Sequence, residues 1–313
     1  MANQPTSNPA PTGKAILWTT PRMIAMAFTK CLSGVPGCQI WIEPFGFSSF
    51  AREEMKKAGI TELPWCYEGH EKEFKVASEN LENFLNCYFP PERLPFANVK
   101  RALEESDSKY VFVKDESVSM KAEDAKKYLP TSYKHSFLLR HPLLVFNSFR
   151  KALFGQLSAS NSLKDESHKS EDVFDLRLYA RDYYVEDLFE NHYNMWKYVK
   201  ENIDPSPMVI DAADLLDHPH QVVSKYCECV GFPYSESLLK WNPSPEVASA
   251  WKWPSDTLYR NKTFGGRSME SSEFIKALPA PAKEQLTEDV VELAEQAMPF
   301  YDEMYGHRLQ ISA

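Results

Sequence analysis

Short apolar runs alternate with longer stretches of helix-forming residues over most of this chain. Five of the runs have the length and apolar character of strands that are buried on both faces of a sheet. They cover residues 16–18, 39–43, 110–114, 135–140 and 207–211. Because strands that alternate with helices usually pair in parallel, the pattern predicts an α/β fold, in which helices flank a parallel sheet.

The stretches between the runs are predicted to be mostly helical. Predicted helices cover residues 22–33, 48–58, 174–201 and 218–230, and two more begin near residue 119 and at Pro142. Residues 61–109 are more helical than not, and prolines interrupt them.

The remaining segments are polar or lack periodicity. Residues 1–13 predict a disordered lead, and residues 156–172, with few apolar anchors, predict a mobile loop. We therefore expect a single domain over residues 14–308. Its last third shows no clear strand and is expected to cover one end of the sheet.

The first strand runs into a turn that contains Pro21 and Arg22, and then into a helix that Gly34 ends. A strand that enters a helix through a tight turn directs free backbone N–H groups at one point. This makes an anion site, to which Arg22 adds a positive charge. Taken alone, however, the stretch is better explained as an ordinary strand–helix junction with an incidental arginine.

A second motif follows the fourth predicted strand. Arg140 stands at the strand end, Pro142 opens a helix, and Ser148 lies within that helix. An arginine fork and a hydroxyl near a helix N-terminus can bind a terminal phosphate. Taken singly, this motif also has a simpler reading, a helix-opening arginine and a surface serine.

Charged residues follow several of the predicted strands. In open α/β sheets the ligand binds beyond the carboxyl ends of the strands, so these positions are candidates for a site. They are Arg22, Glu43, Lys114, Asp115, Glu116 and Arg140.

Composition narrows the class of protein. The chain has 313 residues, a net charge of −9 and six cysteines, and its Cys227-Glu-Cys229 segment lacks the spacing of a zinc site. The negative charge argues against nucleic acid as a partner, and no apolar run approaches the ~20 residues of a membrane span. With no apolar core of a secretory signal near the start, we expect a cytoplasmic protein with free thiols, no metal and no membrane span. The sequence leaves open whether the protein forms a homodimer.

Together, the two motifs resemble those of the sulfotransferase family, which uses 3′-phosphoadenosine 5′-phosphosulfate (PAPS) as sulfuryl donor and releases 3′-phosphoadenosine 5′-phosphate (PAP). That family has a Thr/Ala-x-Pro-Lys/Arg-Ser-Gly-Ser/Thr-Thr loop for the 5′-phosphosulfate. It also has an Arg-x-Pro, with a serine eight positions after the arginine, for the 3′-phosphate. In this chain Thr20-Pro21-Arg22 matches the first motif, and Arg140, Pro142 and Ser148 match the second.

Further matches occur in the expected order over about residues 14–240. The Glu43-Pro44-Phe45 segment is most similar to a divergent branch of sulfotransferases, whose members are often labelled branched-chain-aminotransferase-like. Later segments also resemble the family, namely the strand and Asp-Leu-Leu of residues 209–216 and the Gly-Phe-Pro turn of residues 231–233. The resemblance implies a P-loop-NTPase-like sheet and a small hydroxylated acceptor.

The resemblance also implies roles for individual residues. The phosphosulfate loop corresponds to Thr20, Pro21, Arg22, Met23, Ile24, Ala25 and Met26, and the 3′-phosphate site to Arg140 and Ser148. Arg22 is expected to stabilise negative charge on the oxygen that bridges sulfur and phosphorus in PAPS. Lys114 corresponds to the lysine of the family's Lys-Thr-His segment. Asp115 and Glu116 follow that lysine in this chain, where many members have the threonine and the histidine.

Sulfuryl transfer needs a base that takes the acceptor's proton. Glu43 aligns with a glutamate that serves as base in other branches, so we rank Glu43 first, Glu116 second and Asp115 third. A late loop of the family closes over the 3′-phosphate and the adenine. Arg260 and Lys262 are its candidates here, although a plain basic loop explains them equally well.

One departure opens an alternative function. The family has small and hydroxylated residues after the loop cation, and this chain has residues 23–26, with Ile24 where glycine is usual. A β-branched residue tolerates a positive φ poorly. The alternative is therefore a sulfotransferase-like protein that binds nucleotide with little or no turnover. A nucleotide-dependent kinase is disfavoured because the chain has no Gly-x-x-x-x-Gly-Lys-Ser/Thr motif.

Overall fold

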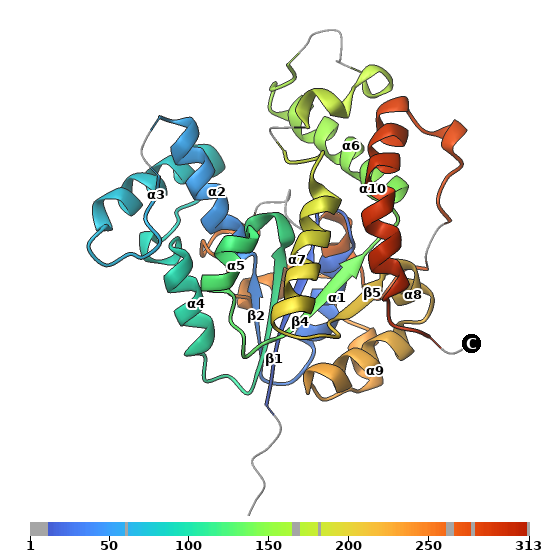
Figure 1. Cartoon of the computed structure of the whole chain (residues 1–313), viewed down its shortest axis with the longest axis horizontal. Helices are drawn as coiled ribbons and strands as arrows, with labels where there is room; N and C mark the ends of the chain where they lie inside the picture. Colours follow the sequence, from blue (N-terminus) through green and yellow to red (C-terminus); the bar gives the residue numbers. More distant parts are fainter. Residues whose placement is uncertain are drawn as a thin grey trace, which may run out of the picture.

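The computed structural model describes residues 12–59, 62–164, 170–180, 183–260, 266–276 and 279–311. Its strands form one sheet in the order β2-β3-β1-β4-β5, and helices lie on both faces (Figure 1). The strands are β1 Gly13–Thr19, β2 Cys38–Ile42, β3 Tyr110–Glu116, β4 Lys134–Leu139 and β5 Met208–Asp211. All four pairings between them are parallel, which confirms the predicted α/β, P-loop-like fold.

Ten α-helices lie within the described residues. They are α1 Ala25–Ser33, α2 Pro44–Lys57, α3 Glu71–Leu85, α4 Phe96–Glu104, α5 Ala122–Tyr128, α6 Pro142–Ala159, α7 Leu188–Asn202, α8 Ala212–Asp217, α9 Pro219–Val230 and α10 Glu288–Gly306. Near the C-terminus, α10 runs beside α6 and α7 (Figure 1).

Aromatic side chains join the sheet to α1 and α9 on one face. The ring of Phe28 in α1 lies 6.2 Å from that of Phe112 in β3 and 4.9 Å from that of Tyr226 in α9. On the other face, Phe137 of β4 meets His192 of α7 at 5.6 Å. Each such buried aromatic ring contributes about 1.5–3 kcal/mol to stability, so these contacts hold both helix layers against the sheet.

Gly13 is the first residue of β1 for a steric reason. A Cβ atom at this position would lie 2.4 Å from the carbonyl oxygen of Val230 and 2.7 Å from the ring of Phe232. The turn after α9 therefore packs directly against the start of β1. Residues 1–11 of the predicted disordered lead lie outside the described residues, and Gly13 already belongs to the sheet.

The predicted helix over residues 174–201 is wrong in its first half. Short 3₁₀ turns at Glu171–Val173 and Leu176–Tyr179 precede α7, which begins at Leu188. The carbonyl of Phe174 accepts a hydrogen bond from the Arg150 side chain instead of a helical N–H. The predicted mobile loop is also partly wrong, because α6 continues to Ala159.

Within the described residues, no helix has both the length and the apolar character needed to cross a membrane. The six cysteines are free thiols, and three of them are buried: Cys31, Cys87 and Cys227.

Candidate functional site

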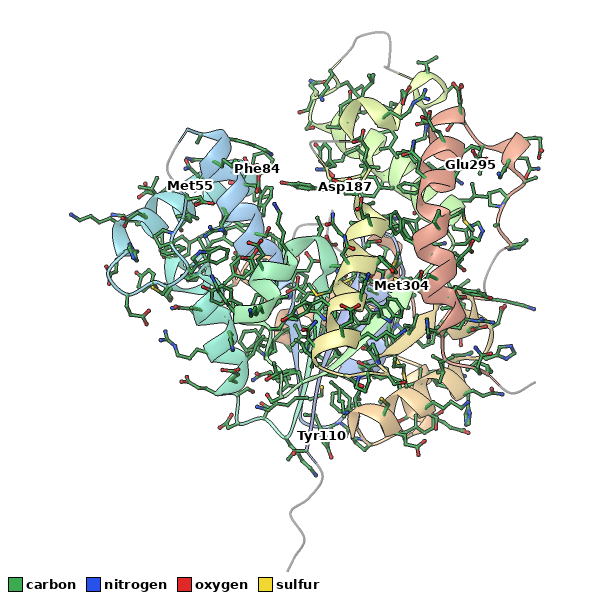
Figure 2. All side chains as sticks on the ribbon, in the orientation of Figure 1. Met55, Phe84, Tyr110, Asp187, Glu295 and Met304 are labelled. Atoms are coloured by element: carbon green, nitrogen blue, oxygen red, sulfur yellow. The ribbon has the colours of Figure 1, made fainter. Side chains whose placement is uncertain are left out.

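The carboxyl ends of four neighbouring strands bring the predicted site residues to one edge of the sheet. In the parallel register, Thr19 of β1 pairs with Glu116 of β3, and Ile42 of β2 pairs with Lys114. Figure 2 shows Tyr110 at the amino end of β3, so Lys114 and Glu116 lie at the opposite end of that strand. The side chains after β1, β2, β3 and β4 therefore meet beyond the same edge, as expected for an open α/β sheet.

The loop between β1 and α1 contains two left-handed residues that are not glycine. Arg22 has a φ of 71° and Ile24 a φ of 62°, and α1 begins only at Ala25, three residues later than predicted. Such a conformation costs about 1–2 kcal/mol per residue. The loop thus makes a tight turn before the helix even though Ile24 stands where the family has glycine. Within the described ranges, no side chain caps the N-terminus of α1.

Arg22, Arg140 and Ser148 lie together, although 126 residues separate Arg22 from Ser148. The Arg22 Nε donates a hydrogen bond of 3.0 Å to the Ser148 Oγ, and an Arg140 N–H donates one of 2.7 Å to the Arg22 carbonyl. Desolvation, with the neighbouring Arg22 charge, lowers the pKa of Arg140. Neither arginine has an ion-pair partner in the part of the chain that the structure describes. Two adjacent guanidinium groups without a carboxylate make a site for a phosphate or sulfate group.

Thr20 supplies an independent sign of a ligand at this loop. Its side chain is only 2% exposed, and its hydroxyl has no hydrogen-bond partner among the residues that the structure describes. Because a buried hydroxyl without a partner is unfavourable, such a group fits a loop that binds an anion. The donor set of Thr20, Arg22, Arg140 and Ser148 therefore suits the phosphate groups of a nucleotide.

A buried lysine lies between two carboxylates at the ends of β2 and β3. The Lys114 Nζ donates to Glu43 Oε1 in a close ion pair and lies 3.4 Å from Glu116 Oε1. Burial lowers the pKa of Lys114, but the charges of Glu43 and Glu116 outweigh it, and the net shift is upward. Burial raises the pKa of Glu116 to about 7, against the opposing effect of Lys114. Lys114 is therefore a fixed cation, and Glu116 can exchange a proton near neutral pH.

Asp115, the third-ranked base, is held in a structural role. Its carboxylate accepts hydrogen bonds from the backbone N–H groups of Phe45 at 2.8 Å, Gly46 at 3.0 Å and Glu116 at 2.8 Å. Its side chain is fully buried at the N-terminus of α2. Burial raises the pKa of Asp115 to about 8, although the backbone donors favour the charged form. Since its oxygens are occupied, Asp115 caps α2.

Of the two late-loop candidates, Arg260 alone lies within the described residues. Arg260 is exposed and contacts the Tyr259 side chain, and Lys262 lies outside the described residues. His70 is half-buried at the start of α3, and His135 is buried and accepts from the Trp18 indole at 3.0 Å. His141, the residue after Arg140, accepts from the Leu143 N–H at the start of α6.

A cavity of about 520 Å³ lies beside the outer edge of β2. Its walls include Trp41, Pro44, Trp253 and Tyr259. Its lining includes none of Glu43, Lys114 and Glu116. We therefore assign the cavity no part in the chemistry.

Residues 203–308, about a third of the chain, match the family model described as a sulfotransferase domain. This match confirms the predicted resemblance, because residues 203–308 are similar to the sulfotransferase domain. The description of this family model supports sulfuryl transfer as the general activity. No curated protein matches the chain.

Solved structures of sulfotransferases align with the chain at low identity. The sulfotransferase domain from the curacin biosynthetic pathway has a TM-score of 0.46 and 18% identity, over 92% of this chain and 98% of its own. The sulfotransferase domain of the Synechococcus PCC 7002 olefin synthase has a TM-score of 0.45 and 17% identity, over 94% and 98%. A sulfotransferase from Alicyclobacillus acidocaldarius has a TM-score of 0.44 and 12% identity, over 95% and 97%.

Proposed function

We propose that this chain, as a single domain over residues 14–308, transfers the sulfuryl group of PAPS to a hydroxyl of a small-molecule acceptor. The observation that carries the proposal is the pair of guanidinium groups of Arg22 and Arg140, held together with Ser148 and without a carboxylate partner among the described residues. The β1–α1 loop, with Thr20, supports the 5′-phosphosulfate end. Arg140 and Ser148 support the 3′-phosphate.

The residues of this chain divide the chemistry between them. When bound, PAPS supplies an activated sulfuryl group whose transfer releases PAP. Arg22 stabilises negative charge that develops on the departing phosphate oxygen, and Lys114 adds a second fixed cation at the same edge. A carboxylate takes the proton of the acceptor hydroxyl as its oxygen attacks sulfur.

We place Glu116 before Glu43 as that base, which reverses the order expected from sequence. A general base is most effective when its pKa is near the working pH, and burial brings the pKa of Glu116 to about 7. Glu43 is committed to the close ion pair with Lys114 and so holds the lysine in place. Glu116 is farther from the lysine and more exposed, with 23% of its side chain accessible against 15% for Glu43.

Nucleotide binding tests the proposal directly. Calorimetry should show that the protein binds PAP more tightly than adenosine 5′-monophosphate (5′-AMP), which lacks the 3′-phosphate. Arg140→Ala should weaken PAP binding about 10- to 100-fold, the effect of losing a charged hydrogen bond to phosphate. Absence of PAP binding at tens of micromolar would rule out the proposal, and unchanged PAP affinity in Arg140→Ala would rule out the 3′-phosphate assignment.

The left-handed Ile24 favours a second candidate function, nucleotide binding without turnover. The strained loop retains its turn but lacks the hydroxyl donors that the family places after the cation. Labelled PAPS with a panel of phenols, sterols and sugars distinguishes the two. Transfer to any of these acceptors supports the enzyme, and tight PAP binding with no transfer across the panel supports the binding protein.

A further inference from the structure

Helix α6 presents different sides to two parts of the molecule. Ser148 and Arg150 are two residues apart, which in an α-helix places them about 200° apart around the axis. Ser148 contacts Arg22 of the anion site, and Arg150 faces away from that site, toward α10 and residues 171–176. The orientation of α6 about its axis therefore sets where the Ser148 hydroxyl lies.

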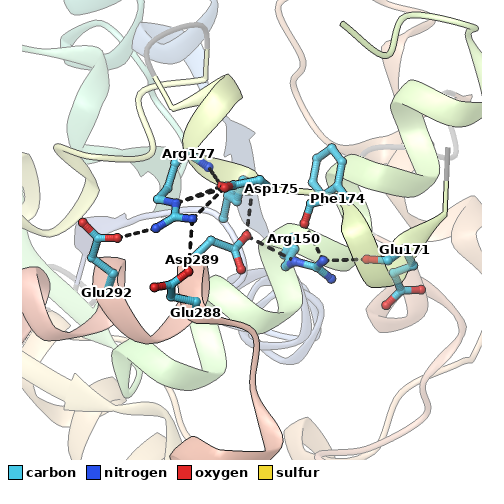
Figure 3. Close-up of polar contacts among 9 residues, drawn as sticks. Arg150, Glu171, Phe174, Asp175, Arg177, Glu288, Asp289 and Glu292 are labelled. Atoms are coloured by element: carbon cyan, nitrogen blue, oxygen red, sulfur yellow. Dashed lines mark hydrogen bonds and ion pairs between the residues drawn. The ribbon is translucent and has the colours of Figure 1, made fainter. Parts of the chain in front are cut away.

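A buried ion pair fixes that orientation. Arg150 and Asp289 are 4% and 3% exposed, and the Arg150 Nε lies 3.3 Å from Asp289 Oδ2. The same guanidinium donates to the carbonyls of Glu171 and Phe174, and the Asp289 carboxylate also accepts from the Leu176 N–H at 2.7 Å. Figure 3 shows how these contacts join three segments: α6, residues 171–176 and the first turn of α10.

Helix α10 holds α6 at a second point. Further along α10, the ring of Tyr301 lies 5.5 Å from that of His141, the residue between Arg140 and α6. The Tyr301 hydroxyl is anchored in turn, since it lies 3.3 Å from Asp211 Oδ2 at the end of β5. One helix therefore steadies both groups of the proposed 3′-phosphate site, Arg140 near His141 and Ser148 through Arg150.

We propose that Arg150 and Asp289 are positioning residues for the 3′-phosphate subsite, so that their ion pair sets the preference of the protein for nucleotides that carry a 3′-phosphate. This inference rests on the proposed function. Neither residue touches the anion site itself, and the effect passes through the rotation of α6. A displacement of about 1 Å at such a site can change its function up to 10²-fold.

The variant Asp289→Asn tests this role, because it keeps the shape of the side chain and removes the charge that holds Arg150. PAP and 5′-AMP are both titrated by calorimetry, after a melting curve has shown that the variant is folded. We expect the Kd for PAP to rise about tenfold and the Kd for 5′-AMP to change less than about twofold, which corresponds to one misplaced hydrogen bond to phosphate. Equal weakening of both ligands, or an unchanged ratio of the two affinities, overturns the inference.

Arg177→Gln is a matched control. Arg177 also joins residues 171–177 to α10, through Glu292 at 2.5 Å and Glu288 at 3.7 Å, and none of these contacts involves α6 (Figure 3). Its removal should leave the ratio of the two affinities unchanged. A loss of preference equal to that of Asp289→Asn contradicts a specific role for the buried pair.

If Asp289→Asn does not fold, two further measurements still test the inference. Arg150→Lys keeps the charge and loses the fork that reaches the two carbonyls, and it should lower the PAP preference in the same direction. In the wild-type protein, saturating PAP should slow amide hydrogen exchange in residues 171–176 and in the first turn of α10 more than saturating 5′-AMP does, because coupling between sites is reciprocal. Equal protection by both ligands overturns the inference. Absence of PAP binding by the wild-type protein instead refutes the proposed function itself.

Discussion

Arg22 and Ile24 are the residues at which local preference and structure disagree most. Both adopt a left-handed backbone conformation that a β-branched residue such as Ile24 avoids. The surrounding structure supplies the compensation. Met23 and Ala25, on either side of Ile24, are buried in the core, and the Arg22 carbonyl and side chain are both hydrogen-bonded. Strain that the packing enforces in this way is typical of loops that bind ligands.

At the level of a single residue, the proposed role of Glu116 as base predicts how activity depends on pH. If it is the base, it must be ionised, so kcat/KM should rise about tenfold per pH unit below its pKa of about 7 and level off above it. Glu116→Gln should lower kcat about 10²- to 10⁴-fold and remove this rising limb. The pH profiles of both proteins, measured with any acceptor found in the panel, check the expectation.

Glu43→Gln is the comparison for that experiment. It weakens the hold on Lys114 but should keep a rising limb in the pH profile, because Glu116 remains. If Glu43→Gln removes the limb and Glu116→Gln retains it, the base is Glu43.

At the level of the element, α2 shows how a contact between distant segments sets a helix start. The sequence predicts a helix over residues 48–58, and α2 begins at Pro44. Pro44 suits a first helical position, and the carboxylate of Asp115, about 70 residues away, accepts from the N–H groups of Phe45 and Gly46. The helix therefore begins four residues early, directly after the Glu43 of the site.

Removing this cap should destabilise the protein. Asp115→Ala leaves three backbone N–H groups without their acceptor, and we expect the free energy of unfolding to fall by about 1–3 kcal/mol. Chemical denaturation measures the change. Asp107→Ala, at an exposed position before β3, is the control and should change stability by less than about 0.5 kcal/mol. Equal stability of the two variants contradicts the capping role.

At the level of the whole molecule, two buried histidines make stability depend on pH. Burial lowers the pKa of His135 to about 4 and that of His192 to about 3, whereas an unfolded chain has histidines near 6.5. Between these values the unfolded state binds more protons than the folded state. The free energy of unfolding should therefore fall as the pH decreases from about 6.5 to 4, by about 1 kcal/mol per pH unit for each histidine.

His135→Gln tests this dependence. Glutamine does not titrate and can still accept a hydrogen bond from the Trp18 indole, which His135 accepts at 3.0 Å. Denaturation curves at pH 6.5 and pH 4.5 should show a smaller loss of stability for the variant than for the wild-type protein. An identical loss in both proteins contradicts the assignment of this acid sensitivity to His135.

The sequence alone determined the architecture and most of the candidate residues. Apolar runs mark each strand of the sheet to within a few residues, because strands buried on both faces need continuous apolar side chains. The parallel order that they imply brings the strand ends together, which made Arg22, Glu43, Lys114, Glu116 and Arg140 candidates before their contacts were known. The strands and the candidate residues could be predicted because their signals are local: each depends on residues that are only a few positions apart in the sequence.

The tertiary structure decided which of these groups act on one another. Lys114 and Glu43 are 71 residues apart, and Arg150 and Asp289 are 139 residues apart. No local sequence pattern therefore predicts either ion pair. The same holds for the left-handed turn at Ile24, which local preference opposes and packing enforces. The pKa of Glu116 and the cap supplied by Asp115 likewise depend on burial, a property of the whole packed chain.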